Sequence, residues 1–167
     1  MSLSADFKPL LAGEVDFKSL KFPVYASPKL DGIRAITGAG RDLFTRSLKQ
    51  VPNRYIKLVL ESLPPGLDGE LVVGSPTDKN VYNKTSSGVM SKDGEPEFTF
   101  LVFDYVNPGF PFHSRLRDSI SLVAAARAKI GSWVEAHEHV LVESLQELLK
   151  YEEECLDSGY GGLILRD

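Results

Sequence analysis

The segment Phe98–Val106 constrains the fold most strongly, because apolar side chains would occupy both faces of the strand that it predicts. Successive side chains of a strand point to opposite faces of its sheet. One face would carry Phe98, Phe100, Val102 and Asp104, and the other Thr99, Leu101, Phe103 and Tyr105. A strand that is apolar on both faces is typically buried on both. We therefore expect this strand at the centre of a sheet.

Further periodic segments surround this strand. Strand patterns cover residues 22–27, 33–38, 42–46, 67–73, 140–142 and 163–166. Helical spacing covers 53–63, 114–130 with Ser114 as N-cap, and 144–156, where Ser144 and Glu147 make a capping box. Residues 78–91 predict short helical turns and loop. Because the connections are mostly short, the pattern predicts an α+β fold with largely antiparallel sheets and packed helices.

Composition narrows the class of protein. The 167 residues, 43% of them hydrophobic, suffice for one globular unit with a core. A net charge of −4 argues against a generally basic surface, so a nucleic-acid partner would need a local patch. Cys155 is the single cysteine, which excludes an internal disulfide and fits a reducing compartment. With no apolar run of membrane-spanning length and no leader pattern, we expect no membrane partner and a cytoplasmic location.

The segment Ser27-Pro28-Lys29-Leu30-Asp31-Gly32-Ile33-Arg34 is a candidate for covalent catalysis. A strand-turn-strand here would hold the Lys29 amine in a partly desolvated cleft, which lowers a lysine pKa and makes the nucleophilic neutral form accessible. Arg34 presents a planar fork of donors that suits a phosphate or a ribose. A tight hairpin with surface charges has the same pattern, so this segment alone does not decide between the two.

Two later segments add candidate ligand-binding residues. Glu70, in Asp68-Gly69-Glu70, begins an apolar strand, where its carboxylate could accept hydrogen bonds from a ribose or help to hold a divalent cation. Phe103 on the central strand could present its ring to a base. The alternatives are a solvated glutamate beside a surface turn and an aromatic side chain of the core.

Taken in order, these segments resemble a known family. Lys29-x-Asp31-Gly32-x-Arg34, Asp68-Gly69-Glu70, Phe103-Asp104 and the terminal Gly162-Leu163-Ile164-Leu165-Arg166 resemble the successive nucleotidyltransferase motifs of ATP-dependent DNA ligases, above all the compact bacteriophage enzymes. The resemblance extends from Tyr25 to Asp167. It implies an ATP-grasp-like nucleotidyltransferase (adenylation) domain that binds the nucleotide between two antiparallel sheets.

The resemblance also implies a mechanism and its residues. Lys29 would attack the α-phosphate of ATP and carry AMP, which would pass to the 5'-phosphate of nicked double-stranded DNA before the 3'-hydroxyl displaces it. Lys29, Asp31 and Arg34 would be catalytic, with Asp31 near the reacting hydroxyl. The nucleotide would lie against Ser27, Lys29, Arg34, Arg46, Glu70 and Phe103, with Glu70 on the ribose and Phe103 on the adenine. Mg²⁺ would screen the phosphates. Such enzymes serve DNA replication, repair and recombination, here in a bacterium or a phage-infected cell.

The chain departs from the family pattern in two places. Gly161 occupies the position of a glutamate that helps to bind the metal, which leaves Glu70 as the predicted metal ligand. The sequence ends at Asp167, before the family's Lys-x-Lys strand and its oligonucleotide-binding-fold domain. We therefore expect residues 1–167 to be a partial adenylation domain with slow self-adenylylation. An unpaired sheet edge would invite association with another copy or with a missing fragment.

Other functions remain open from the sequence. RNA ligases and mRNA-capping guanylyltransferases share the lysine motif, and the choice between ATP and GTP depends on pocket contacts. Gly161 instead favours a non-catalytic, nucleotide-binding remnant. His137 and His139 lie at strand spacing, but two ligands are too few for a zinc site.

Overall fold

The computed structural model describes residues 18–166, which divide into two compact units. One unit is the continuous segment Asp31–His137. The other is built from both flanks of that segment, ending at Leu30 and resuming at Glu138. The length of the chain had suggested one globular unit, whereas its contacts separate into two.

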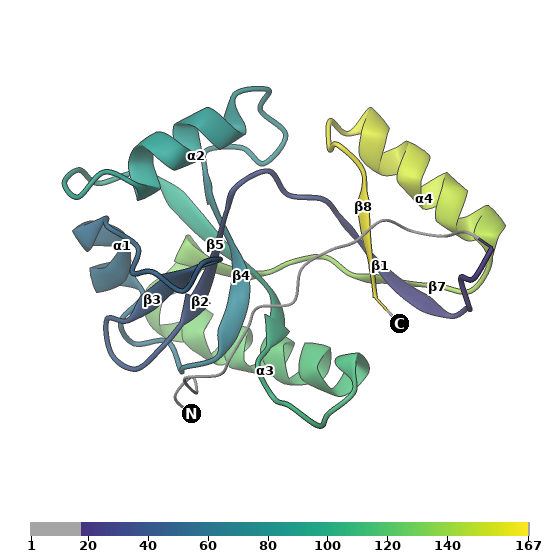
Figure 1. Ribbon diagram of the computed structural model, residues 1–167, viewed down its shortest axis with the longest axis horizontal. Helices are drawn as coiled ribbons and strands as arrows, with labels where there is room; N and C mark the ends of the chain where they lie inside the picture. The colour runs from purple at the N-terminus through teal and green to yellow at the C-terminus, as the bar shows by residue number, and fades with distance from the viewer. Residues whose placement is uncertain (1–17, 167) are drawn as a thin grey trace. The chain divides into compact units, whose positions relative to one another are not determined.

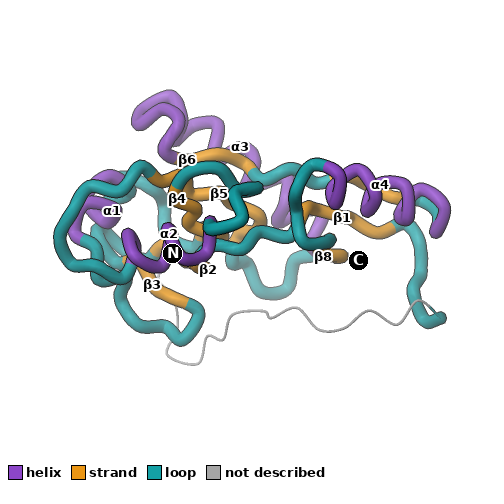
Figure 2. The backbone as a smooth tube through the Cα atoms, turned by 90° about the horizontal axis from the view of Figure 1, so that it is seen from above, coloured by secondary structure: helices purple, strands orange, loops and turns teal. Residues whose placement is uncertain are grey.

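The first unit contains a five-stranded sheet in the order β3-β2-β4-β5-β6, of which Figure 1 labels the first four strands and Figure 2 also β6. Its strands are β2 (Ile33–Thr37), β3 (Leu43–Thr45), β4 (Leu67–Val73), β5 (Phe98–Tyr105) and β6 (Val134–Ala136). All neighbours are antiparallel except β5 and β6, which are parallel. Because β5 lies between β4 and β6, the prediction of an interior strand is confirmed.

Three helices complete this unit and share its core. They are α1 (Arg54–Val59), α2 (Val81–Val89) and α3 (Phe112–Ile130), the last followed by the short 3-10 helix η1 (Gly131–Trp133). Helix α2 packs against β4, and α3 packs against β5 and β6. The core side chains that are at most 1% exposed include Ile56, Leu67, Leu71, Val89, Phe100, Val102 and Val123.

The second unit is a three-stranded antiparallel sheet with one helix. The strands β1 (Val24–Pro28), β7 (Val140–Val142) and β8 (Leu163–Arg166) lie in the order β7-β1-β8, and α4 (Leu145–Asp157) contacts β1 and β7 (Figure 1). Ser144 caps α4 by accepting the Glu147 amide at 3.2 Å. The Glu147 carboxylate accepts the Glu143 amide at 2.9 Å, so the predicted helix start is confirmed. Strand β8 lies at an edge of this sheet.

Strands β1 and β2 do not form the hairpin predicted around Leu30-Asp31-Gly32. Strand β1 pairs with β7 and β8 in the second unit, and β2 pairs with β3 and β4 in the first. Strand β1 thus has both edges taken by segments distant in the sequence, and β2 has one edge taken by its neighbour β3 and the other by β4. Neither strand has an edge left for the other. The turn instead leads from one unit into the other.

Several element boundaries also differ from the predictions. Helix α3 begins at Phe112 with Pro111 as N-cap, so Ser114 lies in its first turn. Proline suits a helix start because it has no amide hydrogen to leave unsatisfied. Residues 81–89 form a regular helix, and β6 was not among the predicted strands. No helix of the described residues has the length and apolar character needed to span a membrane.

Asn53 ties α1 to the turn that follows α2. It is fully buried, and its Oδ1 accepts the Ile56 amide at 2.9 Å as the N-cap of α1. Its Nδ2 donates to the carbonyl oxygens of Ser91 at 2.9 Å and Gly94 at 3.2 Å. The side chain thus satisfies backbone groups from two segments about forty residues apart.

We expect Asn53→Ala to lower the free energy of unfolding by about 1 to 3 kcal/mol, because it removes the N-cap of α1 and the hydrogen bonds that the side chain donates to the turn after α2. Asn83→Ala is the matched control, since Asn83 is exposed on α2. Urea unfolding followed by circular dichroism measures both. Equal losses for the two variants would contradict the assigned role of Asn53.

Candidate active site

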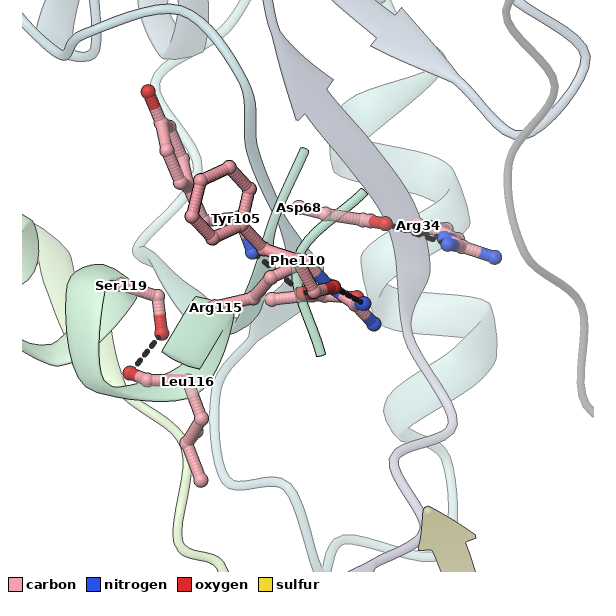
Figure 3. Close-up of polar contacts among 8 residues, drawn as sticks. Arg34, Asp68, Tyr105, Phe110, Arg115, Leu116 and Ser119 are labelled. Carbon is pink, nitrogen blue, oxygen red and sulfur yellow. Dashed lines mark hydrogen bonds and ion pairs between the residues drawn. The ribbon is translucent and has the colours of Figure 1, made fainter. Parts of the chain in front are cut away.

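Asp68 on β4 forms a buried, two-pronged ion pair with Arg34 on β2. Arg34 Nε donates to Asp68 Oδ1 at 3.0 Å, and Nη2 donates to Oδ2 at 2.6 Å (Figure 3). The two side chains are only 12% and 5% exposed. Charge-assisted pairs of this geometry are the strong ones, because both prongs of the guanidinium are used. The predicted phosphate-binding Arg34 is therefore anchored within the protein itself.

Gly69, the next residue, permits a close approach of β4 and β5. A Cβ atom there would collide with the carbonyl oxygen of Leu101 on β5, so only glycine fits. The pairing shifts at this point, because Asp68 lies opposite Asp104 whereas Gly69 lies opposite Val102. Phe103 is the extra residue of the resulting β-bulge.

The bulge changes the face on which Asp104 lies. Simple alternation placed Asp104 with Val102. In the structure Gly69 pairs with Val102, and the preceding Asp68 pairs with Asp104. Because consecutive residues of β4 point to opposite faces, Asp104 shares the face of Asp68 rather than that of Val102. The expected arrangement of the faces is therefore wrong at this end of β5.

Glu70 fixes the turn that precedes β2. Its Oε2 accepts the Gly32 amide at 3.0 Å, and a Cβ at Gly32 would collide with the Leu71 carbonyl oxygen. Burial raises the pKa of Glu70 from 4.5 to about 7, although the bond from Gly32 and the charge of Arg34 act in the opposite direction. Glu70 is thus a carboxyl group that exchanges its proton near neutral pH.

Phe103 is partly buried and lies against Arg34. The guanidinium carbon of Arg34 is 5.7 Å from the centre of the Phe103 ring. This is within the range of a cation–π contact. Arg34 therefore connects the carboxylate of Asp68 to the aromatic ring that sequence reasoning assigned to the base.

A second buried ion pair joins β5 to α3. Arg115 Nε donates to Asp104 Oδ1 at 2.9 Å, and the side chains are 18% and 6% exposed (Figure 3). Arg115 was not among the residues predicted from the sequence. Asp104 did indicate that a partner exists, because an aspartate inside an apolar strand needs a cationic or hydrogen-bonding partner. Nothing in the local sequence identifies that partner.

The lysine motif and the terminal motif meet in the second unit. Lys29 directly follows β1, and its amide donates to the Gly162 carbonyl oxygen at 2.9 Å. Ser27 is 5% exposed and pairs with Ile164 of β8. The Lys29 side chain is exposed, in contrast to the desolvated cleft that the expected hairpin implied.

The predicted site residues thus fall into two groups. Arg34, Glu70 and Phe103 come together in the first unit, where Asp31 and Arg46 are exposed at the turn before β2 and directly after β3. Ser27 and Lys29 belong to the second unit, as does Gly161, which is exposed. Each group is ordered by hydrogen bonds between segments far apart in the sequence.

Glu70, the predicted metal ligand, lies near Asp31 and Asp68, whose negative charges raise its pKa, but the three do not form a metal-binding cluster. Within residues 18–166, no three His, Cys, Asp or Glu side chains gather closely enough to hold a cation. A resident metal site normally draws several such ligands together. The described residues therefore do not fit a resident cation, and Glu70 as a metal ligand stays a prediction.

Solved structures of DNA ligases share this fold. No protein-family model matches the chain, and no curated protein matches its sequence. Chlorella virus DNA ligase-adenylate is 28% identical, with a TM-score of 0.81 over 98% of this chain and 61% of that one. A Lig E DNA ligase is 24% identical, with a TM-score of 0.75 over 95% of this chain and 61% of that one. The ATP-dependent DNA ligase of bacteriophage T7, in complex with ATP, is 19% identical, with a TM-score of 0.59 over 86% and 56%. The chain thus spans about three fifths of the length of these ligases.

We expect Arg34→Met to lower the free energy of unfolding by about 3 to 5 kcal/mol, because it leaves Asp68 buried and uncompensated. Arg41→Met is the matched control. Arg41 pairs with Glu61 at 2.7 Å, but the side chains are 66% and 43% exposed, so its loss should cost less than about 1 kcal/mol. Urea unfolding of both variants checks this contrast, and similar losses would show that burial of the Arg34 pair is unimportant.

The raised pKa of Glu70 predicts a pH-dependent stability. Between pH 4.5 and about 7 the unfolded chain loses this proton while the folded chain keeps it, so the free energy of unfolding falls as pH rises and levels off above pH 7. The total effect is at most about 3 kcal/mol. Glu70→Gln should flatten this slope, whereas Glu97→Gln, at an exposed position, should preserve it. Urea unfolding at pH 5, 6, 7 and 8 tests this, and an unchanged slope in Glu70→Gln would refute it.

Proposed function

Because the chain has the nucleotidyltransferase-domain fold of ATP-dependent DNA ligases, we propose that it forms a covalent lysyl-AMP intermediate on Lys29. The observation that carries the proposal is the match of 98% of the chain to a DNA ligase-adenylate. The order of the Lys29, Glu70, Phe103 and Leu163–Arg166 segments along the chain supports it. The nucleotide is ATP, by analogy with the phage T7 ligase, whose structure was solved in complex with ATP.

The proposed reaction of Lys29 with ATP is a nucleophilic displacement at the α-phosphorus. The lone pair of the neutral Lys29 Nζ attacks the α-phosphorus of ATP, and a P–N bond forms. The bond between the α-phosphorus and the oxygen bridging to the β-phosphorus breaks, and pyrophosphate leaves. The nitrogen, which carries a positive charge once the P–N bond has formed, then loses one proton to solvent. The hydrogen bond from the Lys29 amide to the Gly162 carbonyl oxygen holds the main chain beside β8, and the exposed side chain can reach a substrate.

The other residues bind and orient the nucleotide in this proposal. Phe103 stacks on the adenine, and Glu70 accepts a hydrogen bond from a ribose hydroxyl. Arg34 shapes the base site, because two of its nitrogens already bind Asp68. Ser27 and Arg46 approach the phosphates, and Asp31 lies near the reacting hydroxyl. Mg²⁺, when it arrives with ATP, screens the phosphate charge.

Transfer of AMP to DNA is the second part of the proposal. The whole enzyme would pass AMP to the 5'-phosphate of a nick in double-stranded DNA, and the 3'-hydroxyl would then displace it. This activity belongs to DNA replication, repair or recombination in the cytoplasm of a bacterium or a phage-infected cell. The matched ligases are longer than this chain, so nick sealing is proposed for the whole enzyme.

A second candidate function is nucleotide binding without chemistry. It is favoured by Gly161, where the ligase pattern has a glutamate, and by the lack of a carboxylate cluster among residues 18–166. RNA ligases and guanylyltransferases are further alternatives within the same superfamily. These candidates differ in the nucleotide, in the polynucleotide end, and in whether a covalent product forms.

Incubation with α-phosphate-labelled ATP and Mg²⁺ tests the covalent step. We expect an acid-labile label on the chain, because a P–N bond hydrolyses in acid. The label should disappear in Lys29→Ala and persist in Lys150→Ala, which removes an exposed lysine of the same unit. Binding of ATP by calorimetry without any label would instead support the non-catalytic function.

Competition by unlabelled nucleotides and transfer of the label to a nicked duplex distinguish the remaining alternatives. Excess unlabelled ATP should abolish the label and excess GTP should not, whereas the reverse would identify a guanylyltransferase. The labelled chain is then offered 5'-phosphorylated nicks in duplex DNA or in duplex RNA. Transfer to RNA alone would overturn the assignment as a DNA ligase.

A further inference from the structure

The ion pair between Asp104 and Arg115 lies directly after the β-bulge that contains Phe103. Arg115 donates to Asp104 through Nε at 2.9 Å and through Nη2 at 3.4 Å. Its Nη1 donates to the Phe110 carbonyl oxygen at 2.8 Å, and its guanidinium lies 5.5 Å from the centre of the Phe112 ring. One side chain on the first turn of α3 therefore holds the end of β5 and the loop between them (Figure 3).

Asp104 also organises its own strand. Its Oδ1 accepts the amide of Tyr105 at 2.8 Å in addition to Arg115. The carboxylate thus fixes the main chain immediately after Phe103. A bulge residue lacks a partner in register, so its direction depends on how the flanking residues are held. Asp104 is the flanking residue on one side of Phe103.

The buried charges of Asp68 and Asp104 restrict the register in which β4 and β5 can pair. Asp68 and Asp104 are paired across β4 and β5, and each residue is only 4% exposed. Two like charges directly opposite one another are unfavourable, and buried ones need compensating partners. Arg34 compensates Asp68 and contacts the Phe103 ring, while Arg115 compensates Asp104. A slip of the bulge by one residue would separate at least one aspartate from its arginine.

We propose that Asp104 and Arg115 are positioning residues for the nucleotide, because they lock the bulge that presents Phe103 to the adenine. The inference rests on the proposed function, since it needs ATP as the ligand. It assigns a role to Asp104, which belongs to the Phe103-Asp104 motif, and adds Arg115, which lies outside all of the motifs. Neither needs to touch the nucleotide, because both act through the direction of the Phe103 ring.

A double-mutant cycle on the full chain tests this. Calorimetry with α,β-methylene-ATP, which cannot release pyrophosphate, gives the dissociation constant without chemistry. Arg115→Lys keeps the charge beside Asp104 but loses the guanidinium fork. It should raise the dissociation constant about tenfold in the parent chain and less than about twofold in a Phe103→Ala background. Asp104→Asn should behave in the same way, and Arg117→Lys, an exposed position on α3, should have no effect.

The labelling reaction supplies a second measurement. Arg115→Lys should raise the apparent ATP constant while the maximal rate of labelling stays within about twofold, because the defect is in base positioning. Equal effects of Arg115→Lys in the parent and Phe103→Ala backgrounds would overturn the proposal, as would no effect in either. Failure of the parent chain to bind the analogue would overturn the proposed function as well. Intact coupling without any label on Lys29 would overturn only the proposed catalysis.

Discussion

The two buried aspartates that face each other across β4 and β5 are the constraint on which the first unit depends. Neither Asp68 nor Asp104 can remain ionised inside the protein without a cation, and each recruits an arginine from a different element. Arg34 thereby joins β2 to β4, and Arg115 joins α3 to β5. The same two pairs hold the bulge at Phe103, so the stability of the sheet and the geometry of the proposed base site have one physical origin.

Two glycines allow main-chain segments near the proposed site to approach each other closely. Gly69 lets β4 approach the carbonyl of Leu101, and Gly32 lets the turn before β2 approach that of Leu71. The second approach brings the Gly32 amide to the Glu70 carboxylate, and this hydrogen bond partly offsets the burial that raises the pKa of Glu70 to about 7. A Cβ atom at either glycine would collide with a main-chain carbonyl oxygen and force the strands apart.

Local patterns predicted the elements well and their partners poorly. The strand at residues 98–105 and the Ser144 N-cap of α4 depend on neighbouring residues, so both were predicted and confirmed. The hairpin around Leu30-Asp31-Gly32 was wrong because β1 pairs with the distant strands β7 and β8, whereas β2 pairs with β3 and β4 in a separate sheet. Asp104 was placed on the wrong face because a bulge reverses the alternation without leaving a local pattern. Arg115 was missed for a related reason, since its partner lies eleven residues away on another element.

The sequence by itself determined the α+β class, most of the strands and helices, and the order of the Lys29, Glu70 and Phe103 motifs that led to the ligase resemblance. These follow from side-chain periodicity and from residue types that carry particular chemistry. Only the tertiary structure decided that the described chain forms two units, that Arg34 is anchored by Asp68, and that Phe103 lies in a bulge braced by Arg115. Those features depend on pairing between segments distant in the chain, where burial of charge and the close approach of main chains select one register among many.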